Sequence, residues 1–121
     1  MLLLLDTITY FCTVIGIMRA GYTCFAISPR NSPEAVAHLL TASETALLLV
    51  SSEFSMVALG ESALKMMRGK VPPMHHMPVF EDLFTSAMDP AFVTYPEVKY
   101  DPESIALILH SSGSYRLKIR V

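Results

Sequence analysis

The sequence predicts an α/β fold, specifically a three-layer fragment with a mainly parallel sheet. Three short runs, residues 22–27, 46–50 and 105–109, are apolar at nearly every position, which is typical of strands buried on both faces of a parallel sheet. The segments around the first two runs repeat apolar residues at steps of three and four, as amphipathic helices do. Helices that alternate with such strands favour an α/β layer arrangement.

The composition limits the class of protein further. With 121 residues the chain has the length of one domain or part of one, and 52% hydrophobic against 17% charged residues exclude intrinsic disorder. The mean hydropathy of +0.44 is high for a soluble domain, so either a membrane segment or a further layer of protein must cover apolar surface. A net charge of -2 gives no basic surface, and we expect no nucleic-acid partner.

The first segment, residues 1–18, resembles a signal peptide or a membrane helix in its apolar content. Asp6 and Arg19 enclose an apolar run shorter than the roughly 20 residues that cross a bilayer, and no basic residue precedes it as in a signal peptide. We therefore expect no membrane insertion but a buried helix, with Asp6 as its N-cap and Gly21 as the left-handed residue at its end. Its expected buried face consists of Ile8, Phe11, Ile15 and Met18.

A second helix follows the strand at 22–27. Ser32 is placed to cap it and Pro33 to occupy its first position. After the strand at 46–50, a third helix is expected from Ser51, Ser52 and Glu53 to Gly69, with one apolar face made by Met56, Leu59, Ala63 and Met67. Residues 70–103 contain six prolines that break longer patterns, and only residues 77–80 favour a further short strand.

The cysteines and the adjacent histidines give little indication of a metal site or of a disulfide. Cys12 and Cys24 lie among apolar neighbours with no CxxC spacing, so we expect two buried, reduced thiols and a cytoplasmic protein. The pair His75 and His76 has no carboxylate or cysteine at ligand spacing, and no metal site is expected.

The segment with the clearest chemical signal is the loop after the strand at 105–109. Ser111, Ser112, Gly113 and Ser114 combine three hydroxyls with a residue that lacks Cβ, so that backbone N–H groups and hydroxyls can approach phosphate oxygens closely. Serine-rich turns after strands are common, so by itself the segment is a weak indication of nucleotide binding and also fits a polar turn.

Residues 105–114 resemble the phosphate-loop motif of adenylate-forming enzymes, the superfamily of acyl-CoA synthetases, luciferases and peptide-synthetase adenylation domains. That motif reads Ser/Thr-Ser/Thr-Gly-Ser/Thr-Thr-Gly-x-Pro-Lys, and residues 111–114 match its first half. Upstream, residues 18–40 resemble the helix, strand, Pro-containing turn and helix of the same family, and Ile-Ser-Pro-Arg-Asn-Ser-Pro at 27–33 is most similar to fungal peptide-synthetase-like carboxylic acid reductases. The resemblance implies part of the large N-terminal domain of such an enzyme, with ATP and Mg as cofactors and Ser111, Ser112, Gly113 and Ser114 as cofactor-binding residues.

The chain departs from this family after Ser114. Where the motif continues Thr-Gly-x-Pro-Lys, the chain has Tyr-Arg-Leu-Lys-Ile, and Lys118 stands one position before the lysine of the family. We therefore do not assign the lysine role to it. The expected organisation is a partial AMP-binding domain over residues 1–114 and a divergent tail over 115–121, as in a truncated or frameshifted copy.

The resulting functional prediction is a truncated adenylate-forming domain without activity, in which ATP and Mg are not bound productively. No catalytic residue and no metal ligand is assigned. Two alternatives remain open: a non-catalytic α/β remnant, and an interaction module that docks its apolar faces on a protein partner or on a second copy. In each case part of the apolar surface lacks a cover, so the chain alone is expected to aggregate or to need a partner.

Overall fold

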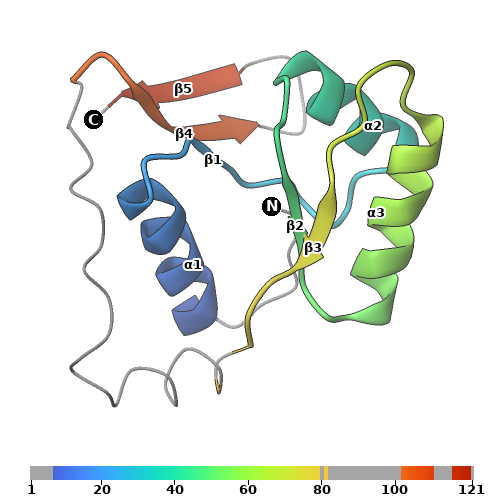
Figure 1. Cartoon of the computed structure of the whole chain (residues 1–121), viewed down its shortest axis with the longest axis horizontal. Coiled ribbons are helices and arrows are strands. Elements are labelled where there is room, and N and C mark those ends of the chain that lie inside the picture. Colours follow the sequence, from blue (N-terminus) through green and yellow to red (C-terminus); the bar gives the residue numbers. More distant parts are fainter. Residues whose placement is uncertain (1–6, 80, 82–101, 111–115, 121) are drawn as a thin grey trace. The chain divides into compact units, whose positions relative to one another are not determined.

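The computed structural model describes residues 7–79, 81, 102–110 and 116–120, and these form three helices and five strands (Figure 1). The described residues divide into two compact units: residues 27–77 form one, and residues 7–26, 78, 79, 81, 102–110 and 116–120 form the other. The elements in chain order are α1 (Thr7–Arg19), β1 (Cys24–Phe25), α2 (Pro33–Ala42), β2 (Leu48–Val50), α3 (Phe54–Met66), β3 (Met74–His76), β4 (Ile105–His110) and β5 (Arg116–Arg120).

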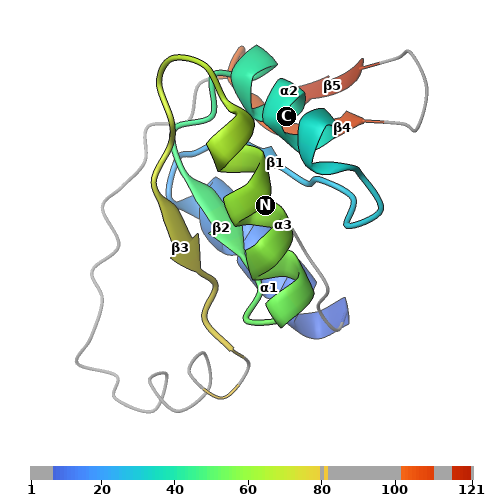
Figure 2. The same cartoon turned by 90° about the vertical axis from the view of Figure 1, so that its right-hand side faces the viewer.

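The unit at 27–77 packs α2, α3 and a two-stranded parallel sheet of β2 and β3. Leu48 is paired with Met74 and Val50 with His76, and α3 packs on β2 and on α2 (Figure 2). The close approach of α3 to the sheet depends on Gly60, because a Cβ there would lie 2.9 Å from the sulfur of Met74 and 3.2 Å from Cγ1 of Val50. The apolar core of this unit consists of Ile27, Val36, Ala37, Leu40, Leu48, Val50, Met56, Ala63 and Met77.

The second unit holds a three-stranded sheet in the order β1, β4, β5. β4 runs parallel to β1, with Cys24 opposite Leu107, and antiparallel to β5, with Leu109 opposite Leu117. The hydroxyl of Thr23 donates to the carbonyl of Ile105 and ties the start of β1 to the start of β4. α1 packs against β1.

Local signals account for the helix ends. α1 ends in a Schellman motif, in which Tyr22 N–H donates to Ile17 (3.1 Å) and Gly21, at φ 79°, donates to Met18 (3.0 Å). Ser32 caps α2 by accepting from the N–H of Ala35 at 3.3 Å, and Pro33 is the first helical residue. Asp6, expected to cap α1, lies outside the described residues.

The predicted α/β class is confirmed, with three differences in the strands. β1 and β2 are shorter than the predicted runs 22–27 and 46–50. The strand expected at 77–80 was wrong: β3 covers Met74–His76, since these residues pair with β2 while Pro78 has no N–H to donate. Residues 116–120, for which no strand was predicted, form β5 antiparallel to β4.

α3 also differs from its predicted limits. It begins at Phe54 after Glu53, as expected, but it ends at Met66, and Gly69, at φ 102°, comes after the helix rather than at its end. Met56, Gly60 and Ala63 form the buried face, whereas Leu59 is half-buried. The buried face is therefore narrower than the apolar spacing predicts.

The predicted buried face of α1 was wrong. Ile8, Phe11 and Ile15 are 58%, 58% and 53% exposed, and the buried side chains are Thr9 and Thr13. A buried threonine is tolerated on this face because the Thr13 hydroxyl donates to the carbonyl of Thr9 at 2.8 Å. Cys12 is likewise exposed rather than buried, while Cys24 in β1 is buried as expected.

No helix in the described part of the chain is long and apolar enough to cross a membrane. α1, the most apolar helix, has thirteen residues against the roughly 20 that a bilayer requires.

Candidate functional site

The strand before the predicted phosphate loop is built as expected. β4 is parallel to β1, so the carboxyl ends of the two strands lie at the same edge of the sheet. In open α/β sheets ligands bind at this edge, beyond the carboxyl ends of parallel strands. Ser111, Ser112, Gly113 and Ser114 come directly after β4 in the sequence but lie outside the described residues.

Two rings from distant parts of the sequence meet at this edge. The ring of Phe25 in β1 and the imidazole of His110, the last residue of β4, have centroids 5.8 Å apart and planes at 89°. An edge-to-face contact of this kind stabilises a pair beyond its buried area by about 0.5–1.5 kcal/mol. The pair therefore holds the end of the strand from which the serine-rich segment departs.

The predicted strand at 105–109 stopped one residue before His110, and the contact of His110 with Phe25 was not predicted. The two residues are 85 positions apart, and their proximity results from the register that sets Phe25 opposite Ile108. His110 lies two residues beyond Ile108, on the same side of β4, where a diagonal neighbour can reach an aromatic ring. No signal within either segment specifies this register.

The segment that replaces the second half of the motif is a strand. Lys118 is paired with Ile108, and Arg116 with His110, in the antiparallel ladder of β4 and β5. The backbone of Lys118 is thus engaged in pairing with β4. Tyr115 lies outside the described residues.

The histidine pair does not form a converging site. His75 and His76 are both exposed on β3, and successive residues of a strand point to opposite faces. Among the residues that the structure describes, no group of three or more His, Cys, Asp or Glu side chains is placed to hold a metal ion.

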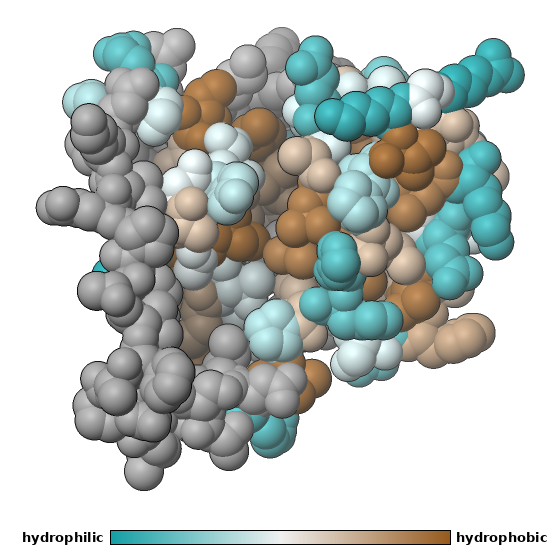
Figure 3. Space-filling view, viewed as in Figure 1, coloured by the Kyte–Doolittle hydropathy of each residue, from teal (hydrophilic) through white to brown (hydrophobic). Residues whose placement is uncertain are grey.

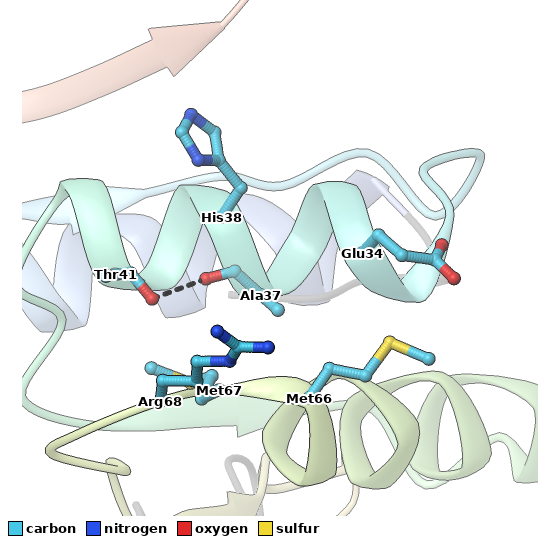
Figure 4. Close-up of a pocket in the computed structure, with 7 residues that line it drawn as sticks. All are labelled: Glu34, Ala37, His38, Thr41, Met66, Met67 and Arg68. Atoms are coloured by element: carbon cyan, nitrogen blue, oxygen red, sulfur yellow. Dashed lines mark hydrogen bonds between the residues drawn. The ribbon is translucent and has the colours of Figure 1, made fainter.

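An open hollow of about 370 Å³ lies between α2 and the end of α3, and no sequence pattern predicted it. Figure 4 shows His38 pointing away from Met66, Met67 and Arg68, which lie across the hollow from α2. The Thr41 hydroxyl donates to the Ala37 carbonyl at 2.8 Å and is not directed at a ligand. The residues that line the hollow are Glu34, Ala37, His38, Thr41, Met66, Met67 and Arg68.

The electrostatics of this hollow are those of a solvated surface. The pKa of Glu34 is lowered by a hydrogen bond from its own backbone N–H and by one from the Ser32 hydroxyl. Glu34, His38 and Arg68 are all exposed, so none of these charged or titratable groups is buried and aimed into the space. Such a hollow offers no arrangement for general acid–base or nucleophilic chemistry.

Sequence similarity to known proteins identifies the family of this chain. Residues 1–114 match the sequence pattern of a family described as AMP-binding enzyme. The chain belongs to the AMP-binding enzyme family. The α/β arrangement with parallel strands is that of a fragment of an AMP-binding domain.

The curated relatives of this member of the family are fungal. It is 40% identical over 121 residues to an adenylate-forming reductase of Heterobasidion annosum, covering 93% of this chain and 11% of that protein. It is 31% identical over 118 residues to an adenylate-forming reductase of Serpula lacrymans, covering 90% and 10%. A non-canonical non-ribosomal peptide synthetase of Acremonium egyptiacum is 34% identical over 99 residues, covering 82% and 9%.

The chain thus spans about a tenth of the length of these relatives. No solved structure matches it. The resemblance to fungal adenylate-forming reductases predicted from residues 27–33 and 111–114 is confirmed.

Proposed function

We propose that this chain carries the phosphate-contacting edge of an acid-adenylating domain and that, by itself, it does not form acyl-adenylates. The observation that supports the phosphate-contacting role is the parallel pairing of β1 and β4. The carboxyl ends of these strands lie at one sheet edge, and Ser111 directly follows β4 in the sequence. In this proposal residues 1–114 act as a partial AMP-binding domain and residues 115–121 do not take part in nucleotide binding.

The donors of the loop fit a polyphosphate. Ser111, Ser112 and Ser114 each supply a hydroxyl, and Gly113 allows the backbone N–H groups to approach an anion. In acid activation a carboxylate oxygen attacks the α-phosphorus of ATP and pyrophosphate leaves, and the ATP-bound magnesium supplies charge neutralisation for that departure. The part assigned to this chain is to hold the phosphates at the end of β4.

The proposed lack of activity rests on the residues after Ser114. The second glycine, the proline and the lysine of the family motif are replaced, and Lys118 is paired within the ladder of β5. Without the lysine of the family motif and with no acid-binding residue assigned, charge that develops in the transition state lacks the stabilising partner that the motif supplies.

Acid-dependent exchange of pyrophosphate into ATP tests this directly. Purified chain is assayed over a panel of aryl and aliphatic acids, with a full-length adenylate-forming reductase as positive control and Ser112→Ala as matched negative control. We expect exchange equal to that of Ser112→Ala for every acid. Signal above that variant with any acid would overturn the proposed inactivity.

A repaired variant tests the assignment of the loop separately. Replacing residues 115–119 by Thr-Gly-Phe-Pro-Lys restores the family motif, and ATP binding is measured by titration calorimetry. We expect tighter ATP binding than in the natural chain, and loss of that gain when Ser112→Ala is added. Equal binding with and without Ser112→Ala would remove the loop from the proposal.

An interaction module is the second candidate, favoured by the exposed apolar side of α1. Ile8, Phe11 and Ile15 are exposed, whereas Thr9 and Thr13 are buried. A helix that packs only within its own domain has the opposite arrangement, with its apolar side buried.

A further inference from the structure

The contact between Phe25 and His110 lies where the backbone pairing of β1 and β4 has already ended. That pairing sets Cys24 opposite Leu107 and Phe25 opposite Ile108, so His110 lies two residues beyond the last pair. Apolar side chains reach the surface in several places, as the brown areas in Figure 3 show, but here two rings meet in a defined geometry, with centroids 5.8 Å apart and planes at 89°. The side chains, and not the backbone ladder, therefore connect β1 to the end of β4.

The two neighbouring strands hold His110 in different ways. Its backbone is paired with Arg116 in the antiparallel ladder of β4 and β5. Its imidazole is half-buried and meets the half-buried ring of Phe25 from β1. An edge-to-face contact favours one relative orientation of two rings, so the last residue of β4 is restrained in its side chain as well as in its backbone.

The other ends of β1 and β4 are joined separately. There the hydroxyl of Thr23 donates to the carbonyl of Ile105. Removal of the Phe25 ring leaves this hydrogen bond and the backbone pairing in place. A substitution of Phe25 should therefore act at the carboxyl ends of the two strands and not along the whole of β4.

The predicted phosphate-contacting residues follow this restrained strand end. Residues 111–114 lie in the sequence between His110 and Arg116, which are paired with each other. Because Ser111 is bonded to His110, restraint on His110 limits the directions in which the chain can leave β4. A binding segment whose attachment point is already fixed loses less freedom when it binds, and this raises its affinity.

We propose that Phe25 is a positioning residue for nucleotide binding. Through its contact with His110 it fixes the point at which the serine-rich segment leaves β4, and it thereby strengthens binding of the ATP phosphates. This inference rests on the proposed function, because it takes residues 111–114 as the phosphate-contacting segment. Phe25 itself touches no phosphate and acts only through His110.

Equilibrium dialysis of the natural chain against radiolabelled ATP with magnesium measures the dissociation constant. We expect Phe25→Leu, which keeps an apolar side chain but removes the ring, to raise this constant about two- to tenfold, the factor that corresponds to one edge-to-face contact. Phe25→Tyr keeps the ring and should bind ATP as the natural chain does. Tyr22→Leu is the matched control, because Tyr22 is 69% exposed and precedes β1. Equal effects of Phe25→Leu and Tyr22→Leu, or no recovery in Phe25→Tyr, would overturn the proposal.

A double-mutant cycle tests whether Phe25 acts through His110. In a chain that carries His110→Ala, the addition of Phe25→Leu should change the ATP dissociation constant no further, because the contact is already lost. Additive effects of the two substitutions would contradict the proposal. Circular dichroism gives the folded fraction of each variant. If Phe25→Leu does not fold, His110→Phe and His110→Gln make the same comparison, and the variant with a ring should bind ATP more tightly.

The contact also has a spectroscopic signature. The ring current of Phe25 displaces the imidazole proton resonances of His110, which are assigned by comparison with His110→Gln. Phe25→Leu should move these resonances in the NMR spectrum and leave those of the other histidines, His38, His75 and His76, unchanged. His110 resonances that do not respond to Phe25→Leu would show that the two rings are not in contact.

The positioning role and the proposed function fail in different ways. ATP binding that Ser112→Ala weakens but Phe25→Leu does not would remove the role of Phe25 and retain the phosphate-contacting segment. Absence of ATP binding, or binding that Ser112→Ala does not change, would remove the segment and the role of Phe25 together.

Discussion

Two cysteines of the same chain illustrate how position on an element decides side-chain chemistry. Cys12 lies on the exposed side of α1, whereas Cys24 is 1% exposed in β1. Burial raises the pKa of the Cys24 thiol because its thiolate would lose hydration. Cys24 therefore combines low access with a low thiolate fraction, and both reduce its reactivity.

We expect iodoacetamide at pH 8 to modify Cys12 at least about tenfold faster than Cys24 in the folded chain. Mass spectrometry of tryptic peptides gives the two rates, and urea should bring them close together. The variant Cys12→Ser should take up label slowly until it is unfolded. Rapid modification of Cys24 under native conditions would show that β1 is not buried as described.

Glu34 is a second residue whose titration depends on its surroundings. The pKa of its carboxyl lies below the ordinary value of 4.5, because its own backbone N–H and the Ser32 hydroxyl donate to the carboxylate. A pKa that is lower in the folded state contributes stability above the unfolded value and loses it as pH falls through the folded value. Glu34 is fully exposed, so the contribution is small.

Glu34→Gln is accordingly expected to lower the urea midpoint slightly at pH 7, and the difference from the natural chain should disappear as the pH is lowered from about 4.5 through the folded pKa. Paired urea titrations at several pH values measure this. Glu44→Gln, a change of the same charge outside the first turn of α2, is the control. A difference that grows on acidification would contradict the sign.

At the scale of the element, a glycine in α3 and a glycine in α1 differ in what an added Cβ would contact. Gly60 allows α3 to lie against β2 and β3, because its missing Cβ would contact Met74 and Val50. Gly16 in α1 has no neighbour within 4 Å of a built Cβ and therefore only costs the helix conformational freedom. Replacing each glycine by alanine therefore distinguishes the effect of helix propensity, measured at residue 16, from the effect of side-chain packing, measured at residue 60.

We expect Gly16→Ala to stabilise the chain by about 0.5–1 kcal/mol through helix propensity. Gly60→Ala has the same propensity gain but overpacks the contact with β2, where the branched Val50 side chain has little freedom to move, and we expect net destabilisation of about 1–2 kcal/mol. Urea unfolding of both variants measures the free energies. Stabilisation by Gly60→Ala would mean that α3 is not packed as closely as described.

At the scale of the whole molecule, the apolar excess of the chain is visible as exposed surface. Besides Ile8, Phe11 and Ile15 of α1, the large apolar side chains Tyr22, Phe54 and Val71 are 69%, 86% and 47% exposed. The chain matches about a tenth of the length of its adenylate-forming relatives, and its described residues fall into two compact units with small sheets. Apolar area left in water forfeits about 25 cal/mol per Å², so such a chain has a small margin of stability.

We therefore expect the free energy of unfolding at low concentration to fall below about 5 kcal/mol, the lower end of ordinary domains. The urea midpoint should rise with protein concentration, because association stabilises the folded state. Light scattering alongside the titration reports the mass against 13.4 kDa for one chain. A stable monomer with a cooperative midpoint that does not change with concentration would contradict this expectation.

The sequence by itself determined the features that depend on a few neighbouring residues. Ser32 and Pro33 start α2 and Gly21 ends α1 as predicted, since caps act through hydrogen bonds within one turn. The apolar run before Ser111 is a strand, and the wording around 27–33 and 111–114 identified the AMP-binding family. Each of these signals lies within a short segment and can be interpreted without knowledge of the rest of the fold.

Only the tertiary structure decided which side of α1 is buried and which strands pair with one another. Spacing indicates that α1 has an apolar side, but only the packing of the folded chain decides that Thr9 and Thr13 are buried, because buried area depends on residues distant in sequence. Pairing with β2 placed a strand at Met74–His76 instead of 77–80, and pairing with β4 made a strand of Arg116–Arg120. The contact of Phe25 with His110 has the same origin, since the register between two strands is set by the sheet and not by either segment.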